Sequence, residues 1–292
     1  MLDFKKKLFF VLLVLSIFLF FLSFINFQSI KKNKLNIVVT NGAVYDFVRN
    51  IANDKVNIIR LDYYNDLSKN KKISLSLNDL EKLNSANLIL KIGFDFDNWL
   101  DDNFKGRYYY LYNKVFLIKD EDEANPYYWL SIKNAQIIIR DINQILKSYD
   151  PNNSFYYDKK TYDYLLKLKE LEEYANNNLN NLKNKKLVII THPSLKYLLK
   201  DYEIKTIEID KLNEIKASEV LKLVKLIKDN QIKVIFSEKN LIFNDFLVQI
   251  INLYDLKLYF LDSIISIDPE TSYYNLMKEN FDKIKEALSE NN

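Results

Sequence analysis

Two series of short apolar runs, each run followed by a segment of helical spacing, limit the folds that this chain can adopt. The first series starts at residue 35 and the second at residue 186. The runs are rich in Val, Ile and Leu and are too short for helices, which is typical of buried strands. Strands that alternate with helices form parallel sheets that are covered on both faces. The pattern therefore predicts an α/β fold with two lobes, each with a parallel sheet flanked by helices.

The predicted elements divide the chain into four parts. In the first series, strands are predicted at 35–40, 56–61 and 87–92, and helices at 43–53 and 77–86. In the second series, strands are predicted at 186–191, 232–237 and 256–261, and helices at 218–230, 243–254 and 272–288. We expect an N-terminal lobe over 35–150, a linking segment over 151–185, a C-terminal lobe over 186–292 and a separate segment over 1–34.

The linking segment reads as one long helix over 155–184, just after Pro151. Its apolar positions recur three and four residues apart. They are Tyr164, Leu168, Leu171, Ala175, Leu179 and Leu182. A helix of about 28 residues is roughly 42 Å long. We expect it to run along both lobes as a rigid spine, and a coiled-coil segment is the alternative.

The N-terminal segment contains an apolar run over 8–25 that follows three lysines, Lys5–Lys7. The run carries no charge, and a helix of this length spans roughly 27 Å, close to the hydrocarbon thickness of a bilayer. A basic stretch before an apolar run is typical of an export signal. The run is long and no A-x-A site follows it, which favours an uncleaved signal anchor over a cleaved signal peptide. We therefore expect an extracytoplasmic protein that is anchored to the cell membrane by residues 8–25.

Composition excludes several classes of protein and of site. The chain has no Cys and a single His, which excludes disulfides, thiolate metal sites and zinc sites built mainly from histidine. The first 34 residues hold six lysines and one aspartate, so the remainder carries 36 basic and 38 acidic side chains. A slightly acidic body argues against nucleic-acid binding. No G-x-S-x-G, P-loop, G-x-G-x-x-G or H-E-x-x-H motif is present, so we expect no enzyme.

Several segments follow one another in an order that is typical of one family. They are residues 35–40 with 45–52, residues 79–90, Asn125-Pro-Tyr-Tyr-Trp-Leu-Ser131, Thr191-His-Pro-Ser-Leu-Lys-Tyr-Leu198, residues 232–238 and residues 261–264. Together they resemble the zinc- and manganese-binding solute-binding proteins of metal-ion ABC importers. No single segment is specific, but the set runs in order over most of the chain, and the long helix falls where that family has its linking helix.

The resemblance implies that four side chains hold a metal ion, zinc or manganese, between the lobes. His192 matches the third family ligand and Asp262 the fourth, while Glu238 matches a further acidic residue beside the cleft. At the two positions of the first lobe where the family has histidine, this chain has Lys71 and Tyr127. The second lobe therefore keeps its half of the site, whereas the first lobe has lost both ligands.

The two replacements leave two hypotheses open. Transition metals take three or four nitrogen or oxygen ligands at about 2.0–2.2 Å. Tyr127 is a poor ligand near neutral pH because a phenol has a pKa of about 10, and Lys71 would repel a cation. The chain is then either the solute-binding protein of a zinc or manganese ABC importer, with an ABC permease as its partner, or a paralogue with a degenerate metal site that serves as a surface scaffold or adhesin-like interaction module.

Overall fold

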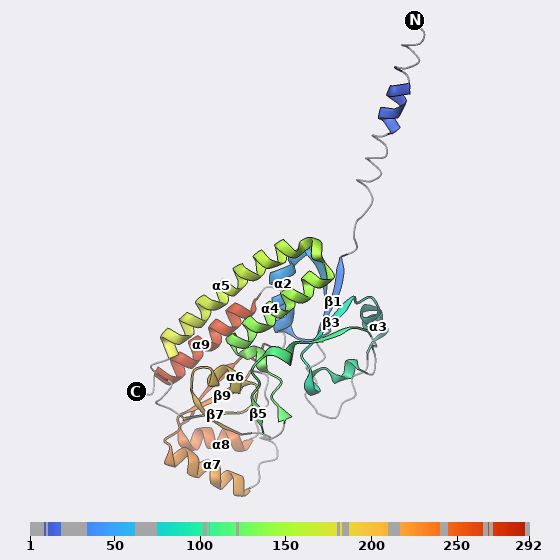
Figure 1. Ribbon diagram of the computed structural model, residues 1–292. Coiled ribbons are helices and arrows are strands. Elements are labelled where there is room, and N and C mark those ends of the chain that lie inside the picture. The colour runs from blue at the N-terminus through green and yellow to red at the C-terminus, as the bar shows by residue number, and fades with distance from the viewer. Residues whose placement is uncertain are drawn as a thin grey trace, which may run out of the picture. The chain divides into compact units, whose positions relative to one another are not determined.

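The computed structural model describes residues 9, 11–18, 34–61, 75–101, 104, 106–120, 123–179, 182, 187–209, 217–239, 245–264, 268 and 271–289 (Figure 1). Residues 1–34 and 35–292 form two separate compact units. In the first unit, residues 11–18 are helical and expose their apolar side chains. Within the described ranges, no helix is both long and apolar enough to cross a membrane. Half of the predicted anchor over 8–25 lies outside these ranges.

Two four-stranded parallel sheets form the body of the second unit, so the predicted α/β fold is confirmed. In spatial order, the first sheet consists of β2 (Val56–Arg60), β1 (Leu35–Val39), β3 (Leu88–Lys91) and β4 (Tyr108–Tyr110). The second consists of β10 (Lys257–Leu261), β9 (Val234–Glu238), β7 (Leu187–Ile190) and β8 (Lys205–Glu208). Both have the same topology, because the first strand of each lies between its second and third. The strand order of each sheet therefore reverses at one point, between β1 and β3 or between β7 and β9, and ligands of such sheets bind outside this point.

Helices cover both sheets. Those of the first lobe are α2 (Gly42–Ala52), α3 (Leu77–Asn84) and α4 (Ile132–Tyr149), followed by the long α5 (Ser154–Leu179). Those of the second lobe are α6 (Leu195–Lys200), α7 (Ala217–Asp229), α8 (Asp245–Tyr254) and α9 (Tyr273–Ser289). A short antiparallel hairpin joins β5 (Lys119–Asp120) to β6 (Glu123–Ala124). Short 3₁₀ helices cover Asn53–Lys55, Phe94–Phe96, Asn98–Leu100, Leu111–Lys114, Tyr128–Leu130 and Pro151–Asn153.

Both faces of each sheet are buried, which explains why the strands read as continuous apolar runs. In β1, Ile37 and Val39 belong to one core cluster, and Val38 belongs to another that includes Leu83 of α3. In β9, Phe236 and Ile235 belong to different clusters in the same way. Successive residues of a strand point to opposite faces, so an apolar residue is needed at every position.

The long helix α5 joins the lobes through one continuous core. Its predicted apolar stripe is buried from Tyr164 to Leu179. It packs against α2 and α4 of the first lobe and against α9 of the second (Figure 1). The helix ends at Leu179, earlier than predicted, and Leu182 lies in a turn. Asparagines at 176–178 precede this end, and asparagine is a weak helix former.

A buried carboxylate ties three of these helices together. Asp46 of α2 is fully buried and forms an ion pair with Arg49. Its Oδ2 accepts hydrogen bonds from the Tyr164 hydroxyl of α5 at 2.8 Å and from the Tyr273 N–H of α9 at 3.1 Å. Burial, with the Asp46 charge as the next cause, raises the pKa of Tyr164 well above its usual value. The hydroxyl therefore stays protonated and remains a donor to Asp46.

Candidate metal centre

Three adjacent strands of the second sheet end at the predicted ligands. His192 follows β7, Glu238 ends β9, and Asp262 follows β10. The strands are parallel and β9 lies between the other two, so all three residues lie at one edge of the sheet. Neighbouring strands are about 4.8 Å apart, which places the ends of β7 and β10 about 10 Å from each other. His192 and Glu238 flank the point where the strand order reverses.

Contacts between the ends of β7 and β9 bring His192 beside Glu238. The Thr191 N–H donates to the Phe236 carbonyl oxygen at 3.1 Å, and the Thr191 hydroxyl donates to the Ser237 hydroxyl at 2.8 Å. The next residue on each strand is a predicted site residue. His192 Nδ1 lies 3.2 Å from Glu238 Oε2, and both side chains are largely buried.

The imidazole of His192 is oriented through Nδ1. Besides Glu238, this nitrogen lies 2.8 Å from the Ser194 hydroxyl, and it accepts a hydrogen bond from the Ser194 N–H at 3.2 Å. The other ring nitrogen, Nε2, makes no hydrogen bond within the part of the chain that the structure describes. The Ser194 N–H uses the lone pair of Nδ1, whereas a hydrogen bond to the Glu238 carboxylate needs a proton on that nitrogen. In the tautomer with the proton on Nδ1, the Nε2 lone pair is available to a metal ion.

Asp262 is held by its backbone and by one of its carboxylate oxygens. The buried Asn280 of α9 accepts from the Asp262 N–H at 2.8 Å and donates to the Asp262 carbonyl at 2.9 Å. Oδ1 accepts from the Ile264 N–H at 2.8 Å, and Oδ2 lies 3.1 Å from Lys239 Nζ. The carboxylate is therefore fixed in orientation, and its Oδ2 faces a cation.

The first lobe contributes Tyr127 to this region. The Tyr127 side chain is buried, and its ring meets the His192 ring edge to face at 5.2 Å between centroids. Two bonds beside it join the lobes. Asn125 Nδ2 donates to the Pro193 carbonyl at 2.9 Å, and Trp129 Nε1 donates to the Ser263 carbonyl at 2.8 Å. The segment that carries Tyr127 is thus fastened to the loops that carry His192 and Asp262.

The reversal point of the first sheet is occupied by a carboxylate that the sequence analysis missed. Asp97 accepts hydrogen bonds from the Thr40 hydroxyl at 2.8 Å and from the N–H groups of Ile92 and Gly93 at 2.7 and 3.0 Å. Gly93 has a φ of +89°, and a Cβ there would lie 2.5 Å from the Tyr112 ring, so this turn requires glycine. Asp97 therefore closes the end of the first sheet.

Burial raises the pKa of Asp97 to about 6. The hydrogen bond from Thr40, the backbone N–H groups and the charge of Lys91 oppose this shift and are the smaller contributions. Lys91 is fully buried, pairs with Asp101 at 2.6 Å and lies over the Tyr108 ring. The first lobe thus places a carboxyl and a lysine near its strand ends, and both have partners of their own.

Within the described ranges, no three His, Asp or Glu side chains lie close enough together to hold a metal ion. The described residues bring His192 next to Glu238 and Tyr127, and they place Asp262 one strand further along. Lys71 lies outside the described residues. The ligand set that the sequence predicts therefore stays a prediction.

Comparison with known proteins decides the family. A family model described as "ZnuA: Zinc-uptake complex component A periplasmic" matches residues 37–287. The chain belongs to this family. The zinc-uptake component A family consists of substrate-binding transport proteins rather than enzymes, so the family that the sequence predicted is confirmed.

Curated relatives and solved structures agree with the zinc-uptake component A family. The manganese ABC transporter substrate-binding lipoprotein PsaA of Streptococcus mitis is 27% identical over 286 residues, which cover 88% of this chain and 90% of the relative. A metal ABC transporter substrate-binding lipoprotein of Lactococcus lactis is 25% identical, with 96% of both chains covered. The substrate-binding protein FpvC of Pseudomonas aeruginosa, solved in complex with Mn²⁺, has a TM-score of 0.76 at 22% identity over 89% of this chain and 100% of its own. That likeness concerns the fold.

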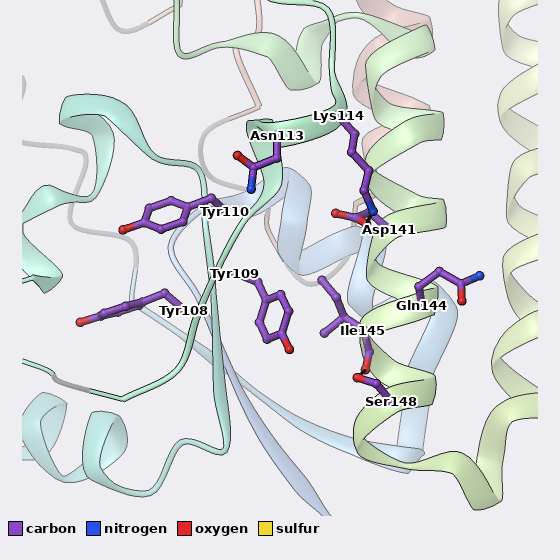
Figure 2. A pocket seen from close by; sticks show the side chains of 9 residues that line it. All are labelled: Tyr108, Tyr109, Tyr110, Asn113, Lys114, Asp141, Gln144, Ile145 and Ser148. Atoms are coloured by element: carbon purple, nitrogen blue, oxygen red, sulfur yellow. Dashed lines mark hydrogen bonds and ion pairs between the residues drawn. The ribbon is translucent and has the colours of Figure 1, made fainter.

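A hollow of about 370 Å³ lies elsewhere, between β4 and α4 (Figure 2). Figure 2 shows Tyr109 and Ile145 facing one another across it, with an ion pair between Lys114 and Asp141 at its rim. None of the predicted metal ligands lines this hollow. The predicted ligands His192, Glu238 and Asp262 lie at the ends of strands of the second sheet instead, so we place the candidate site there.

Proposed function

We propose that this chain is the solute-binding component of a metal-ion ABC importer and that it binds a divalent cation, zinc or manganese, outside the cytoplasm. The observation that carries the proposal is the imidazole of His192, whose Nδ1 faces the Glu238 carboxylate while Asp262 lies at the same sheet edge. Family membership and the names of the relatives, which refer to manganese and metal transport, support the choice of metal ion.

The proposed ligands are His192, through Nε2, and Asp262, through its carboxylate. When the ion is bound, the proton of His192 lies on Nδ1 and is donated to Glu238 in place of the contact with the Ser194 N–H, so that Nε2 can bind the metal ion. In this arrangement Glu238 orients His192 from the side of the ring opposite to the ion, so the direct ligands are His192 and Asp262. Tyr127 covers the imidazole and excludes water from one side of it. Few charged ligands favour modest affinity, which suits a carrier that must release its cargo.

A permease of the metal-uptake type is the proposed partner, and residues 8–25 are the proposed membrane anchor. The named relatives are lipoproteins. This chain contains no Cys, so a lipid cannot be attached to a cysteine anywhere in its 292 residues. The charge-free apolar run after Lys5–Lys7 is long enough to take the place of such a lipid.

A surface scaffold with a decayed metal site is not favoured. It rests on Lys71 and Tyr127 in place of histidines, whereas the residues of the second lobe keep the arrangement of a histidine supported by a carboxylate. Metal binding separates the two functions, because a scaffold does not need it.

Calorimetric titration of the full chain in mild detergent with Mn²⁺ and, separately, Zn²⁺ tests the proposal. We expect one site per chain, weakened about 100-fold or more by His192→Ala and about tenfold by Glu238→Gln, since the second change removes only the support of the imidazole. Glu208→Gln is the matched control, because Glu208 is also a carboxylate at the end of a strand of this sheet and pairs with Lys196. Dissociation constants weaker than millimolar for both metals would refute the proposal.

A further inference from the structure

A lysine forms an ion pair with one carboxylate oxygen of Asp262. Lys239 directly follows Glu238 at the end of β9, and its Nζ lies 3.1 Å from Asp262 Oδ2. The register of β9 and β10 pairs Glu238 with Leu261, so the next residue on each strand is one member of this ion pair. The contact thus follows from strand pairing and brings an ammonium group to a proposed metal ligand.

The remaining contacts of Asp262 show which of its oxygens is open to a cation. Oδ1 accepts a hydrogen bond from the Ile264 N–H, and Asn280 bonds both the N–H and the carbonyl of Asp262. Within the described residues, Oδ2 has Lys239 as its partner. An incoming metal ion that uses Asp262 must therefore approach the oxygen where the ammonium lies.

The ion pair is weak enough to open. The Lys239 side chain is 43% exposed and that of Asp262 is 22% exposed, and exposed pairs of this kind contribute little to stability. Lysine has a flexible stem and a strongly hydrated ammonium group, so Lys239 can turn into the solvent at small cost. Two cations cannot share one carboxylate oxygen without strong repulsion.

We propose that Lys239 is a built-in competitor for the metal ion: its ammonium group neutralises Asp262 in the empty protein and must be displaced when the cation binds. The inference rests on the proposed function and adds a residue that sets its affinity. Lys239 lowers the affinity for the cation and returns to Asp262 when the cation leaves, which favours release of the cargo. It also keeps the Asp262 carboxylate compensated when the site holds no metal.

The test compares Mn²⁺ and Zn²⁺ affinities of the full chain with those of Lys239→Ser, Lys239→Arg and Lys233→Ser, by calorimetry at one pH and one salt concentration. Lys239→Ser removes the competitor and should tighten binding about tenfold or more, which corresponds to about 1.4 kcal/mol. Lys239→Arg keeps the charge and should bind as the wild type does. Lys233→Ser removes the same charge just before β9, roughly 20 Å away, and should change affinity less than about twofold.

The outcomes separate this inference from the proposed function. If the wild type binds and Lys239→Ser binds no more tightly than Lys233→Ser, the role of Lys239 as a competitor is refuted and the proposed carrier function stands. If Lys239→Arg tightens binding as much as Lys239→Ser does, competition by charge is refuted. If no form binds more tightly than millimolar, the proposed function fails and the inference with it. Binding by the wild type that Lys239→Ser tightens, while Lys239→Arg and Lys233→Ser leave it unchanged, supports both.

Discussion

At the scale of single residues, Asp97 shows that a buried carboxyl group can organise a turn by accepting hydrogen bonds and also lower stability when it is charged. It accepts three hydrogen bonds at the end of the first sheet, two of them from backbone N–H groups that need a partner. Its pKa is about 6 because burial disfavours the charged form. The same side chain therefore organises the turn after β3 and carries a charge penalty near neutral pH.

This penalty predicts a pH dependence of stability. The pKa of Asp97 rises from 3.8 in a solvated state to about 6 in the fold, so between these values the folded chain holds a proton that the unfolded chain has lost. The contribution of Asp97 to the free energy of unfolding is then greatest below about pH 4, falls as the pH rises to 6, and stays low above pH 6. The total loss is roughly 3 kcal/mol at most. Urea unfolding at several pH values from 4 to 7 measures this loss.

Asp97→Asn provides the comparison. Its amide cannot accept all three hydrogen bonds, so the variant should be less stable than the wild type, but the difference between them should shrink as the pH rises from 4 to 6. Asp54→Asn changes an exposed carboxyl group of the same lobe and should keep the wild-type slope. Parallel curves for the wild type and Asp97→Asn would contradict the assignment.

The site could be predicted from the sequence only where neighbours along the chain fix the geometry. His192, Glu238 and Asp262 follow strands that their apolar runs reveal, so their common edge was predictable. The pairing of Lys239 with Asp262 depends on the register of β9 against β10, which periodicity does not specify. Asp97 was missed because its contact with Thr40, which is distant in sequence, exists only once β1 and β3 lie side by side.

At the scale of elements, the contacts of Asp46 explain how α2, α5 and α9 keep their relative positions. One carboxylate meets a hydroxyl of α5, the first N–H of α9 and the guanidinium of its own helix. Arg49 also donates to the Thr271 carbonyl at 2.7 Å, just before α9. Removing the carboxylate would leave these donors in or near the core without a partner, which is costly.

We therefore expect Asp46→Ala to lower the free energy of unfolding by about 3 kcal/mol or more and Tyr164→Phe to lower it by about 1–2 kcal/mol. The double variant should lose less than the sum, because both changes remove the same hydrogen bond. Tyr162→Phe is the control on the same helix, since Tyr162 is 68% exposed. Urea unfolding measures the wild type and these four variants. Strictly additive losses in the double variant would contradict the hydrogen bond between Tyr164 and Asp46.

The sequence predicted most of the long and strongly patterned elements, and it missed several short ones and one long helix. The strands of both sheets that are buried on two faces were found, because only a continuous apolar run satisfies that environment. The edge strands β2 and β10 were found as well, whereas the edge strands β4 and β8 were not, since their partly buried residues carry no clear period. The helix α4 was also missed, although Ile138, Ile142 and Ile145 have helical spacing and are buried.

At the scale of the whole molecule, the lobes of the 35–292 unit are joined by more than a linker. A single core cluster runs from β1 through α5 to β9 and α9. The bonds from Trp129 to Ser263, from Tyr273 to Trp129 and from Asn125 to Pro193 cross between the lobes beside the candidate site. Such a joint resists hinge bending, because opening it would expose apolar surface and break buried hydrogen bonds.

We accordingly expect the lobes to move little when a metal ion binds. The chain has no Cys, so Glu81→Cys on α3 and Lys225→Cys on α7, both exposed, give two unique sites for spin labels. The distance between the labels, measured by pulsed electron paramagnetic resonance with and without diamagnetic Zn²⁺, should shift by about 1 Å or less. Adding Trp129→Phe removes one of the bonds between the lobes and should broaden the distance distribution. A shift of several ångströms in the otherwise unaltered protein would mean that α5 bends or that the core opens, and the rigid spine would have to be abandoned.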